Sequence, residues 1–479
     1  MKGRCVMRQS ICEFGSYLRT IGVYGYEAVE PIILASLVTE DPLLLIGKAG
    51  TGKTYLLNSL SEVLGMTHRH YNASLINFDE LVGFPYPDPD FNAVRYLETP
   101  ATVWQAESVL IDEISRCKPE HQNRLFSLIH ERRIQGISIL QLRYRWAAMN
   151  PCGEDQGVVD FYEGSLPLDQ ALADRFAFLI PVPDWDVLSE ADQLLISDPR
   201  GEGVISDDGG QLVKLVQEAK ARYETLKNAL PKAVQDYALT VANLLSAADI
   251  RFSPRRVRQL SKNLLAVTAV HDGKMNDDLF FLTLTCTIPH IAWGKSLDET
   301  VVRSAHRAAW NAAFSQGREK WLNDFFLKRS LASRVKHLLE HCPDPDTATV
   351  AVSRTLVAQD PEDRAAFAFA LYPVTLEVEG LVGKEGMNDL GKIACDIVDV
   401  DGVMSWKEMR GRQIPTHPEY ARLSKTLAKL RGKRRERASQ LFYYLLVNGI
   451  TLQNPTDYEK GFNQCISVIR SWLKAQHAQ

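Results

Sequence analysis

A short apolar run that leads into a glycine-rich turn near residue 50 constrains the fold of this chain more than any other feature. Residues 43–46 are Leu-Leu-Leu-Ile, which have the length and composition of a buried strand. Residues 47–54, Gly-Lys-Ala-Gly-Thr-Gly-Lys-Thr, fit the phosphate-loop pattern G-x-x-x-x-G-K-S/T at every fixed position. A helix-like segment follows at residues 55–60. Because strand, loop and helix occur in this order, the sequence predicts an α/β fold with a loop that binds phosphate groups.

The chemistry of phosphate binding explains the residue types in this loop. Glycines let the backbone bend so that successive N–H groups point at phosphate oxygens, and the start of the following helix adds its positive end. Lys53 supplies a mobile positive charge for the outer phosphates of a nucleotide, and Thr54 offers a hydroxyl to Mg²⁺. The residues that we expect to contact the nucleotide are Gly47, Lys48, Ala49, Gly50, Thr51, Gly52, Lys53, Thr54 and Tyr55.

A second motif consists of the apolar run 109–111 and two acids that follow it, Asp112 and Glu113. We expect Asp112 to hold Mg²⁺ through the metal's water shell, and Glu113 to orient and polarise the water that attacks the γ-phosphorus. The other interpretation is a buried strand that ends at a polar loop, but the phosphate loop upstream favours the catalytic one.

A third polar strand end is predicted at Asn150, which follows the apolar segment 144–149. Its amide is suited to a hydrogen bond with the γ-phosphate or with the attacking water. On its own, Asn150-Pro151 would be only a turn signal. The sequence therefore predicts Lys53, Glu113 and Asn150 as catalytic residues, and Thr54 and Asp112 as metal ligands.

The composition is that of an ordinary globular chain. Of its 479 residues 45% are hydrophobic and 24% charged, and the length allows about three domains. The formal net charge of -4 argues against nucleic-acid binding over the whole surface, while a local basic face stays open. No apolar run approaches the roughly 18 residues of a membrane span, and charged residues interrupt the N-terminal segment where a secretory signal would be apolar. The eight cysteines form no C-x-x-C motif, so we expect a cytoplasmic protein with reduced thiols and no zinc site.

Taken together, the motifs resemble those of the AAA+ ATPases, and within them the MoxR group of the helix-2-insert clade, which includes RavA and the CbbQ/NorQ type activators. The resemblance extends over about residues 25–270. The proline-rich segment 84–100 looks like the family's insertion in helix 2. Within it, residues 84–90 cannot form a regular helix, and residues 92–100 are expected to be a loop or hairpin. The acidic segment 152–163 is longer than the family pattern. Besides the phosphate loop, the resemblance rests on residues 110–116, 118–123, 149–151, 163–164, 166–167, 173–176 and 252–255.

This resemblance implies roles for three residues. By similarity Asn150 is sensor 1, Arg175 is the arginine finger that reaches into a neighbouring subunit's site, and Arg255 is sensor 2 over the nucleotide. Arg256 lies next to Arg255 and is the alternative for that role. The resemblance also implies ATP and Mg²⁺ as ligands and a homo-oligomer that forms a hexameric ring. A protein client, and a partner with a von Willebrand factor A domain, are implied in the same way.

The fold class that follows is an AAA+ phosphate-loop αβα sandwich with a helical lid and a mainly helical C-terminal region. Residues 1–185 are expected to form the nucleotide-binding core, residues 186–270 the lid, and residues 271–479 a helical region whose role the sequence does not indicate. Within that last region, the strongly apolar segment 280–288 is expected to be a helix, and 375–379 a short strand.

A concentration of positive charge lies near the C-terminus. Between residues 422 and 437 there are eight lysines and arginines, and Glu436 is the only acid. Two interpretations of this basic run stay open, a solvated helix face and a site for nucleic acid or an acidic partner.

The expected function is Mg²⁺-dependent ATP hydrolysis that remodels or activates a protein client. The alternative is a nucleic-acid-stimulated AAA+ motor or a defence-system effector.

Overall fold

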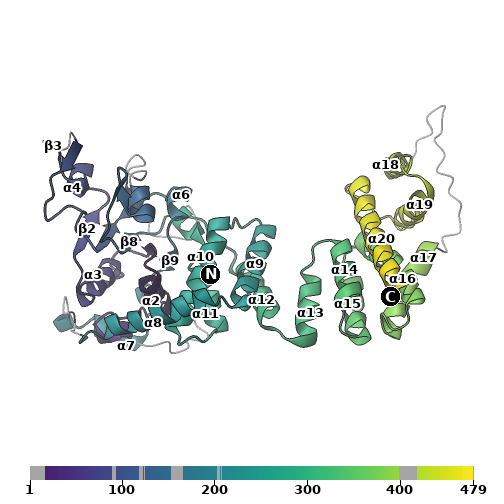
Figure 1. Cartoon of the computed structure of the whole chain (residues 1–479), viewed down its shortest axis with the longest axis horizontal. Coiled ribbons are helices and arrows are strands. Elements are labelled where there is room, and N and C mark those ends of the chain that lie inside the picture. The colour runs from purple at the N-terminus through teal and green to yellow at the C-terminus, as the bar shows by residue number, and fades with distance from the viewer. Residues whose placement is uncertain are drawn as a thin grey trace. The chain divides into compact units, whose positions relative to one another are not determined.

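The chain is described here by a computed structural model, which covers residues 17–88, 93–117, 122, 125–152, 165–201, 205, 208–398 and 418–477. It divides into two compact units, Met1–Ala313 and Phe314–Gln479 (Figure 1). The sequence motifs at 118–121 and 163–164, and most of the acidic segment 152–163, lie outside the described residues. Within the described part, no helix combines the length and the apolar character needed to cross a membrane.

The first unit is built on a five-stranded sheet with the order β2-β5-β8-β1-β9, in which every adjacent pair of strands is parallel. Strands β1 and β8 are buried at every residue, as is typical of central parallel strands that are covered on both faces. This sheet confirms the α/β fold that the sequence predicts. The strands are β1 (Leu43–Ile46), β2 (His68–Asn72), β5 (Ser108–Asp112), β8 (Tyr144–Met149) and β9 (Phe178–Pro181).

The register of the sheet brings the polar strand ends together. Ile46 is paired with Met149, and Asn72 with Asp112. Because the strands are parallel, their carboxyl ends meet at one edge, where the phosphate loop, Asp112 and Asn150 lie. Ligands of open α/β sheets bind at this edge.

Helices accompany the sheet in the first unit (Figure 1). Helix α2 is rich in aliphatic residues, is buried along most of its length and packs against α8 and α10. The α-helices are α1 (Tyr17–Thr20), α2 (Glu30–Thr39), α3 (Lys53–Val63), α4 (Phe78–Val82), α6 (Gln170–Ala173), α7 (Glu190–Ile196), α8 (Gln211–Asn228), α9 (Lys232–Ala247), α10 (Pro254–Val270), α11 (Asp277–Thr285) and α12 (Glu299–Phe314). Shorter turns of helix are η1 (Ile114–Arg116), η2 (Ser127–Glu131), η3 (Trp185–Val187), η4 (Pro199–Gly201) and η5 (Pro289–Trp293).

Two small hairpins complete this unit. Strands β3 (Pro85–Asp88) and β4 (Ala93–Tyr96) pair antiparallel, so the hairpin begins earlier than the loop or hairpin expected at residues 92–100. Strands β6 (Arg133–Ile134) and β7 (Ile137–Ser138) form the second hairpin.

The boundary between the compact units falls between Ala313 and Phe314. Helix α11 confirms the helix expected around residues 280–288, although it begins and ends three residues earlier. Its buried residue Phe280 contacts the rings of Tyr237 in α9 and Trp310 in α12, and α11 also packs against α10. This packing makes the segment after residue 270 part of the first unit.

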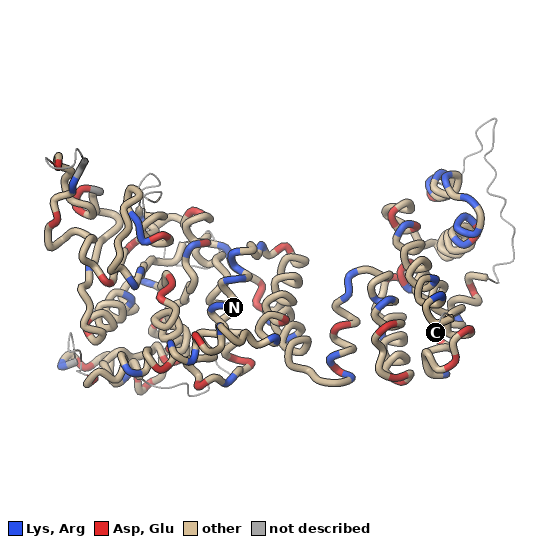
Figure 2. Tube along the Cα trace, in the orientation of Figure 1, with Lys and Arg blue, Asp and Glu red and all other residues tan. Residues whose placement is uncertain are grey.

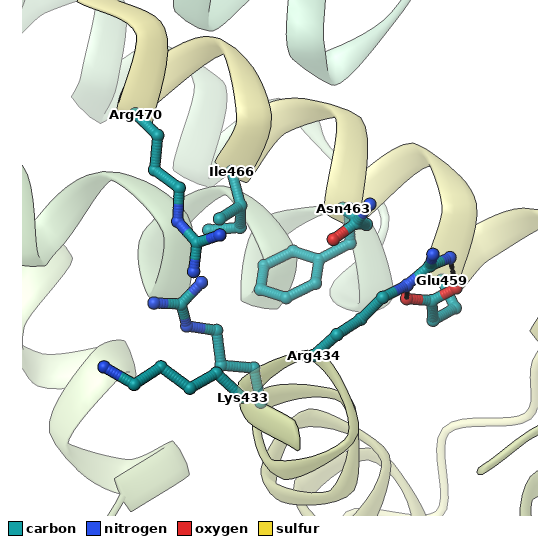
Figure 3. A pocket seen from close by; sticks show the side chains of 8 residues that line it. Lys433, Arg434, Glu459, Asn463, Ile466 and Arg470 are labelled. Atoms are coloured by element: carbon teal, nitrogen blue, oxygen red, sulfur yellow. Dashed lines mark hydrogen bonds and ion pairs between the residues drawn. The ribbon is translucent and has the colours of Figure 1, made fainter. Parts of the chain in front are cut away.

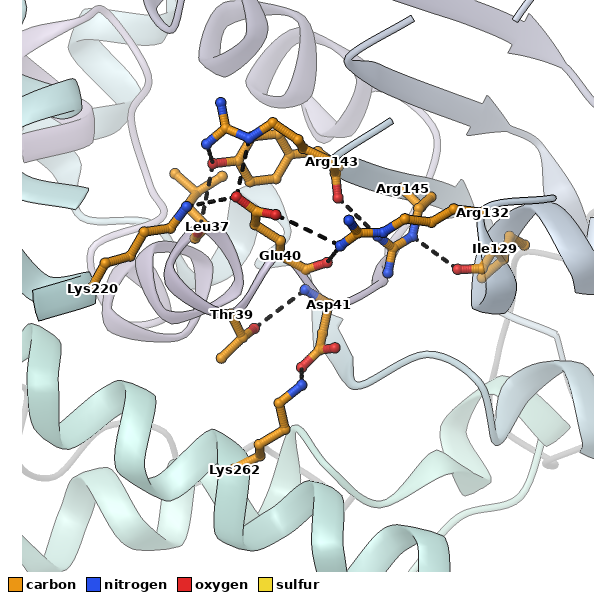
Figure 4. A network of polar contacts seen from close by, with 11 residues as sticks. Leu37, Thr39, Glu40, Asp41, Ile129, Arg132, Arg143, Arg145, Lys220 and Lys262 are labelled. Carbon is orange, nitrogen blue, oxygen red and sulfur yellow. Dashed lines mark hydrogen bonds and ion pairs between the residues drawn. The ribbon is translucent and has the colours of Figure 1, made fainter. Parts of the chain in front are cut away.

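Ion pairs connect the end of α2 with helices α8 and α10 (Figure 4). Glu40 accepts hydrogen bonds from Lys220 of α8 at 2.6 Å and from Arg143, at the start of β8, at 3.0 Å. Its neighbour Asp41 pairs with Lys262 of α10 at 2.6 Å. The two acids after α2 therefore join the sheet to the helices that follow it in the chain.

The second unit is helical in its described part, and one sequence prediction is wrong here. Within residues 375–379, which were expected to form a strand, 375–377 are the last residues of helix α16, which continues through Pro373 to Glu377. Val374 and Thr375 are buried there, so tertiary packing overrides the strand preference of these residue types. The helices are α13 (Gly317–Phe326), α14 (Leu331–His341), α15 (Pro345–Ala358), α16 (Pro361–Glu377), α17 (Lys384–Val398), α18 (Pro418–Leu427), α19 (Gly432–Val447) and α20 (Pro455–His477).

Candidate active site

The phosphate loop connects β1 to α3, and its backbone requires glycine at two of the fixed positions. Gly52 has a φ of 78°, a left-handed conformation that glycine adopts without strain. At Gly47 a Cβ atom would come within 2.8 Å of the Cβ of Val182, which is closer than carbon atoms pack. The glycines that define the sequence pattern are therefore also demanded by the local geometry.

Lys53 is the first residue of α3 and is 8% exposed. Its Nζ donates hydrogen bonds to the carbonyl oxygens of Gly47 and Lys48, both at 2.7 Å, and lies 3.3 Å from Oδ1 of Asn150. Burial lowers the pKa of Lys53, and the nearby carboxylates of Asp112 and Glu113 oppose that effect. These hydrogen bonds hold the ammonium group of Lys53 against the backbone of the phosphate loop.

Asp112 ends β5 beside the start of α3. The hydroxyl of Thr54 donates to its Oδ2 at 2.8 Å, and Nε2 of His70 lies 3.4 Å from the same oxygen. Burial acts to raise the pKa of Asp112, but hydrogen bonds from His70, Thr54 and the N–H of Glu113 outweigh it, so the pKa is lowered. The carboxylate is therefore negatively charged at neutral pH, as a metal ligand must be.

Glu113 follows with a strained backbone. Its φ of 52° lies in the left-handed region, which residues with a side chain rarely adopt and which is common at functional sites. The amide Nδ2 of Asn72 donates to its carboxylate at 3.4 Å, and Nη1 of Arg116 lies 3.5 Å from it. These contacts hold the carboxylate that we expect to orient the attacking water.

Asn72 and Tyr26 are the residues of this site that the sequence predictions missed. Asn72 ends β2 next to Asp112, and the signal that could have found it is its place at the end of residues 69–72, which the sequence allows as a short strand. The hydroxyl of Tyr26 donates to the carbonyl oxygen of Thr51 at 2.9 Å and so supports the phosphate loop. No motif marks this tyrosine.

The side chains and backbone N–H groups of this site are suited to binding MgATP. The hydroxyl of Thr54 and the carboxylate of Asp112 are oxygen donors, and Mg²⁺ takes one or two protein oxygens together with phosphate oxygens and water. In the part of the chain that the structure describes, no group of three or more His, Cys, Asp or Glu side chains is placed to hold a metal by itself. The loop N–H groups and Lys53 provide the positive surroundings that phosphates require.

Asn150 lies where the sequence predicts, directly after β8. It is 8% exposed, and its side chain faces Lys53 across 3.3 Å. The structure thus brings together Lys53, Thr54, Asp112 and Asn150, with Glu113 adjacent to Asp112.

Arg175 is not part of this group. It follows α6, its guanidinium lies 4.5 Å from the centre of the Phe126 ring, and it donates to the carbonyl oxygen of Ala171. Among the described residues, Arg175 makes no hydrogen bond or ion pair with the phosphate loop or with the two acids of its own chain.

The two adjacent arginines of α10 lie in different surroundings. Arg256 is 1% exposed and donates to Asp174 at 3.0 Å, to the carbonyl oxygen of Ala173 at 2.6 Å and to that of Thr287 at 3.0 Å. Arg255 is half-exposed and pairs with Asp174 through one nitrogen at 3.2 Å. Arg256 therefore joins the segment before Arg175 to α10, and Arg255 is the more exposed of the two arginines, which among the described residues makes no hydrogen bond or ion pair with the phosphate loop.

Comparison with known proteins supports the nucleotide site. Residues 42–143, which include the phosphate loop and Asp112-Glu113, match the family model of the AAA domain of the dynein-related subfamily. A solved structure of a candidate ATPase from Cytophaga hutchinsonii is 16% identical and matches with a TM-score of 0.44, over 60% of this chain and 91% of that chain. None of the curated proteins compared with the chain matches it. Residues 42–143, which lie within the five-stranded α/β unit, are thus similar to the AAA domain of the dynein-related subfamily.

Proposed function

We propose that this chain is a Mg²⁺-dependent ATPase of the MoxR type, which assembles into a homo-oligomeric, hexameric ring and remodels or activates a protein client. The observation that carries the proposal is the convergence of Lys53, Thr54, Asp112 and Asn150, with Glu113 beside them, at the carboxyl edge of the parallel sheet. The AAA-domain match over residues 42–143 supports it.

Each residue has a role that its position supports. Bound MgATP supplies an electrophilic γ-phosphoryl group. The loop N–H groups and Lys53 bind the phosphates, and Thr54 and Asp112 hold the metal. Glu113 orients the attacking water and accepts its proton at a carboxylate oxygen. Asn150 positions the same water or the outer phosphate through its amide.

In this proposal Arg175 is the residue that makes hydrolysis depend on assembly. Its guanidinium has no contact with the described phosphate loop of its own chain, which supports a role in the site of a neighbouring subunit. An arginine supplied in this way makes hydrolysis depend on the oligomer, because an isolated subunit lacks a charge that stabilises the transition state. The protein client, a partner with a von Willebrand factor A domain and action in the cytoplasm are part of the proposal and rest on the resemblance to the MoxR group.

Steady-state hydrolysis by Glu113→Gln and Glu62→Gln proteins tests the enzymatic part. The first substitution removes the carboxylate that activates water, so kcat should fall at least about 100-fold while the affinity for ATP stays within about twofold. The second removes an exposed carboxylate of α3 and should leave both quantities unchanged. Equal rates in Glu113→Gln and wild-type protein would refute the assignment.

A further inference from the structure

The second unit contains a positively charged pocket between α19 and α20 (Figure 3). It has a volume of about 270 Å³. Four cations line it, Lys433, Arg434 and Arg437 from α19 and Arg470 from α20, together with one acid, Glu459. Apolar surface is contributed by α20, chiefly by Phe462 and Ile466.

The acid in the pocket is already neutralised. Arg434 donates two hydrogen bonds to the carboxylate of Glu459, at 2.7 and 2.6 Å, and Figure 3 shows this pair at one side of the pocket. The Glu459 side chain is 3% exposed, so this ion pair is a fixed part of the fold. It leaves three of the four cations without a negative partner in the pocket.

Those three cations are Lys433, Arg437 and Arg470. Among the described residues none of them forms a hydrogen bond or ion pair with an acidic side chain. Burial lowers the pKa of Arg437, and repulsion from the nearby Arg470 lowers it further, whereas Glu436 opposes both effects weakly. Two guanidinium groups that repel each other at a pocket wall are stabilised when an anion lies between them.

The start of α19 adds to the positive field. This helix begins at Gly432 without a side-chain cap and without an acidic residue in its first turn. Lys433, Arg434 and Arg435 lie there instead, at the end of the helix that is itself positive. Glu459 neutralises Arg434, but Lys433 and Arg435 remain as further cations at the positive end of the helix, where a bound anion would be stabilised.

The positive surface extends beyond the pocket. Lys425, Lys429, Arg431 and Arg435 are exposed on α18, on the connection and on α19, and Figure 2 shows the blue segments that they form. A single small anion would occupy the pocket and leave the positive charges of these exposed residues without a negative partner. A chain of regularly spaced negative charges would cover both.

We propose that this pocket binds a backbone phosphate of a nucleic-acid strand between Lys433, Arg437 and Arg470, and that neighbouring phosphates lie along the exposed cations of α18 and α19. A phosphate presents oxygens in several directions and can accept from donors on two helices at once, and phosphates recur at regular spacing along a nucleic-acid strand. Protein partners are further disfavoured because stable protein interfaces use exposed apolar anchors. Among the described residues, no exposed large hydrophobic side chain lies in α18 or in the first half of α19.

The test is binding of a fluorescently labelled oligothymidylate to the full chain, measured by anisotropy over a range of salt concentrations and with saturating MgADP. The R437Q/R470Q double variant should bind at least about tenfold more weakly. The negative slope of its log binding constant against log salt concentration should be less steep by about 0.7 for each phosphate that it no longer neutralises. The matched control is K336Q/K392Q, which removes two exposed cations from α14 and α17 of the same unit and should change affinity less than about twofold.

Several outcomes would overturn the proposal. One is the absence of oligothymidylate binding at moderate salt, and a second is an equal reduction of affinity in the two double variants. The third is competition by polyglutamate as strong as that by unlabelled oligothymidylate, and this result would indicate an acidic protein partner. If R437Q/R470Q does not fold, the exposed Lys433→Glu variant replaces it with the same expected reduction. Binding needs no hydrolysis, so Glu113→Gln protein should bind the probe like the wild type even if the proposed enzymatic function fails.

Discussion

At the residue scale, the neighbouring arginines of α10 differ because one is buried and the other is half-exposed. Arg256→Gln leaves the buried acceptors of Asp174, Ala173 and Thr287 without their donor, which should cost about 3 kcal/mol. Arg255→Gln removes only an exposed ion pair and should change stability by less than about 1 kcal/mol.

Thermal unfolding and ATP hydrolysis separate the two arginines. The melting temperature should fall clearly in Arg256→Gln and stay near the wild-type value in Arg255→Gln, whereas kcat should fall about tenfold or more in Arg255→Gln. A stable, inactive Arg256→Gln protein together with an active Arg255→Gln protein would show that the sensor role belongs to Arg256.

The same scale shows what the sequence can predict of the site. Lys53, Thr54, Asp112 and Glu113 were predictable because each belongs to a short local pattern whose residue types follow from phosphate and metal chemistry. The contact of Asn72 with Glu113 was not, because it joins two strands that are adjacent only in the folded sheet.

At the element scale, Glu40 connects α2 with α8 and with the start of β8. Burial acts to raise its pKa, but hydrogen bonds and attraction from Lys220 and Arg143 lower it below the ordinary 4.5. A folded pKa that is lowered contributes stability at pH values above the unfolded pKa, and this contribution is lost as the pH falls through the folded pKa.

Glu40→Gln should therefore lower the melting temperature at pH 7 by about 2–4 °C, and the difference from wild type should shrink below about pH 4. Glu224→Gln, which removes a more exposed carboxylate of α8, is the control and should have little effect at either pH. A difference that grows as the pH falls would contradict the role given to Glu40.

Some helices and strands could be predicted from the sequence, and others could not. The strands around the phosphate loop were predictable because the motifs that follow them require a strand–loop–helix order, whereas a short apolar run alone also fits a buried helix. The strand expected at 375–379 was wrong, because Val374 and Thr375 pack into a helical core that no local pattern reveals.

At the scale of the whole molecule, the proposed arginine finger makes a prediction about mixtures. Arg175→Ala should reduce hydrolysis at least about 1,000-fold, since a finger contributes that much to phosphoryl transfer. Mixing it with Glu113→Gln subunits should restore part of the activity, because a site can then combine an intact Glu113 with an intact Arg175 from its neighbour. Wild-type hydrolysis by Arg175→Ala alone would refute the finger.

The division of the chain was harder to predict than its catalytic motifs. The expected boundary near residue 270 follows where the family resemblance ends, but α11 packs against α10, and the compact units separate only after Ala313. Packing between helices leaves no signal in a single sequence as specific as a phosphate loop.

An active site shared between subunits of a ring requires the protein to assemble, and light scattering on the Glu113→Gln protein with and without MgATP measures that assembly. This variant should bind ATP without turnover, and its mass should rise to that of about six subunits when ATP is added. A protein that remains a monomer under both conditions would contradict the shared site.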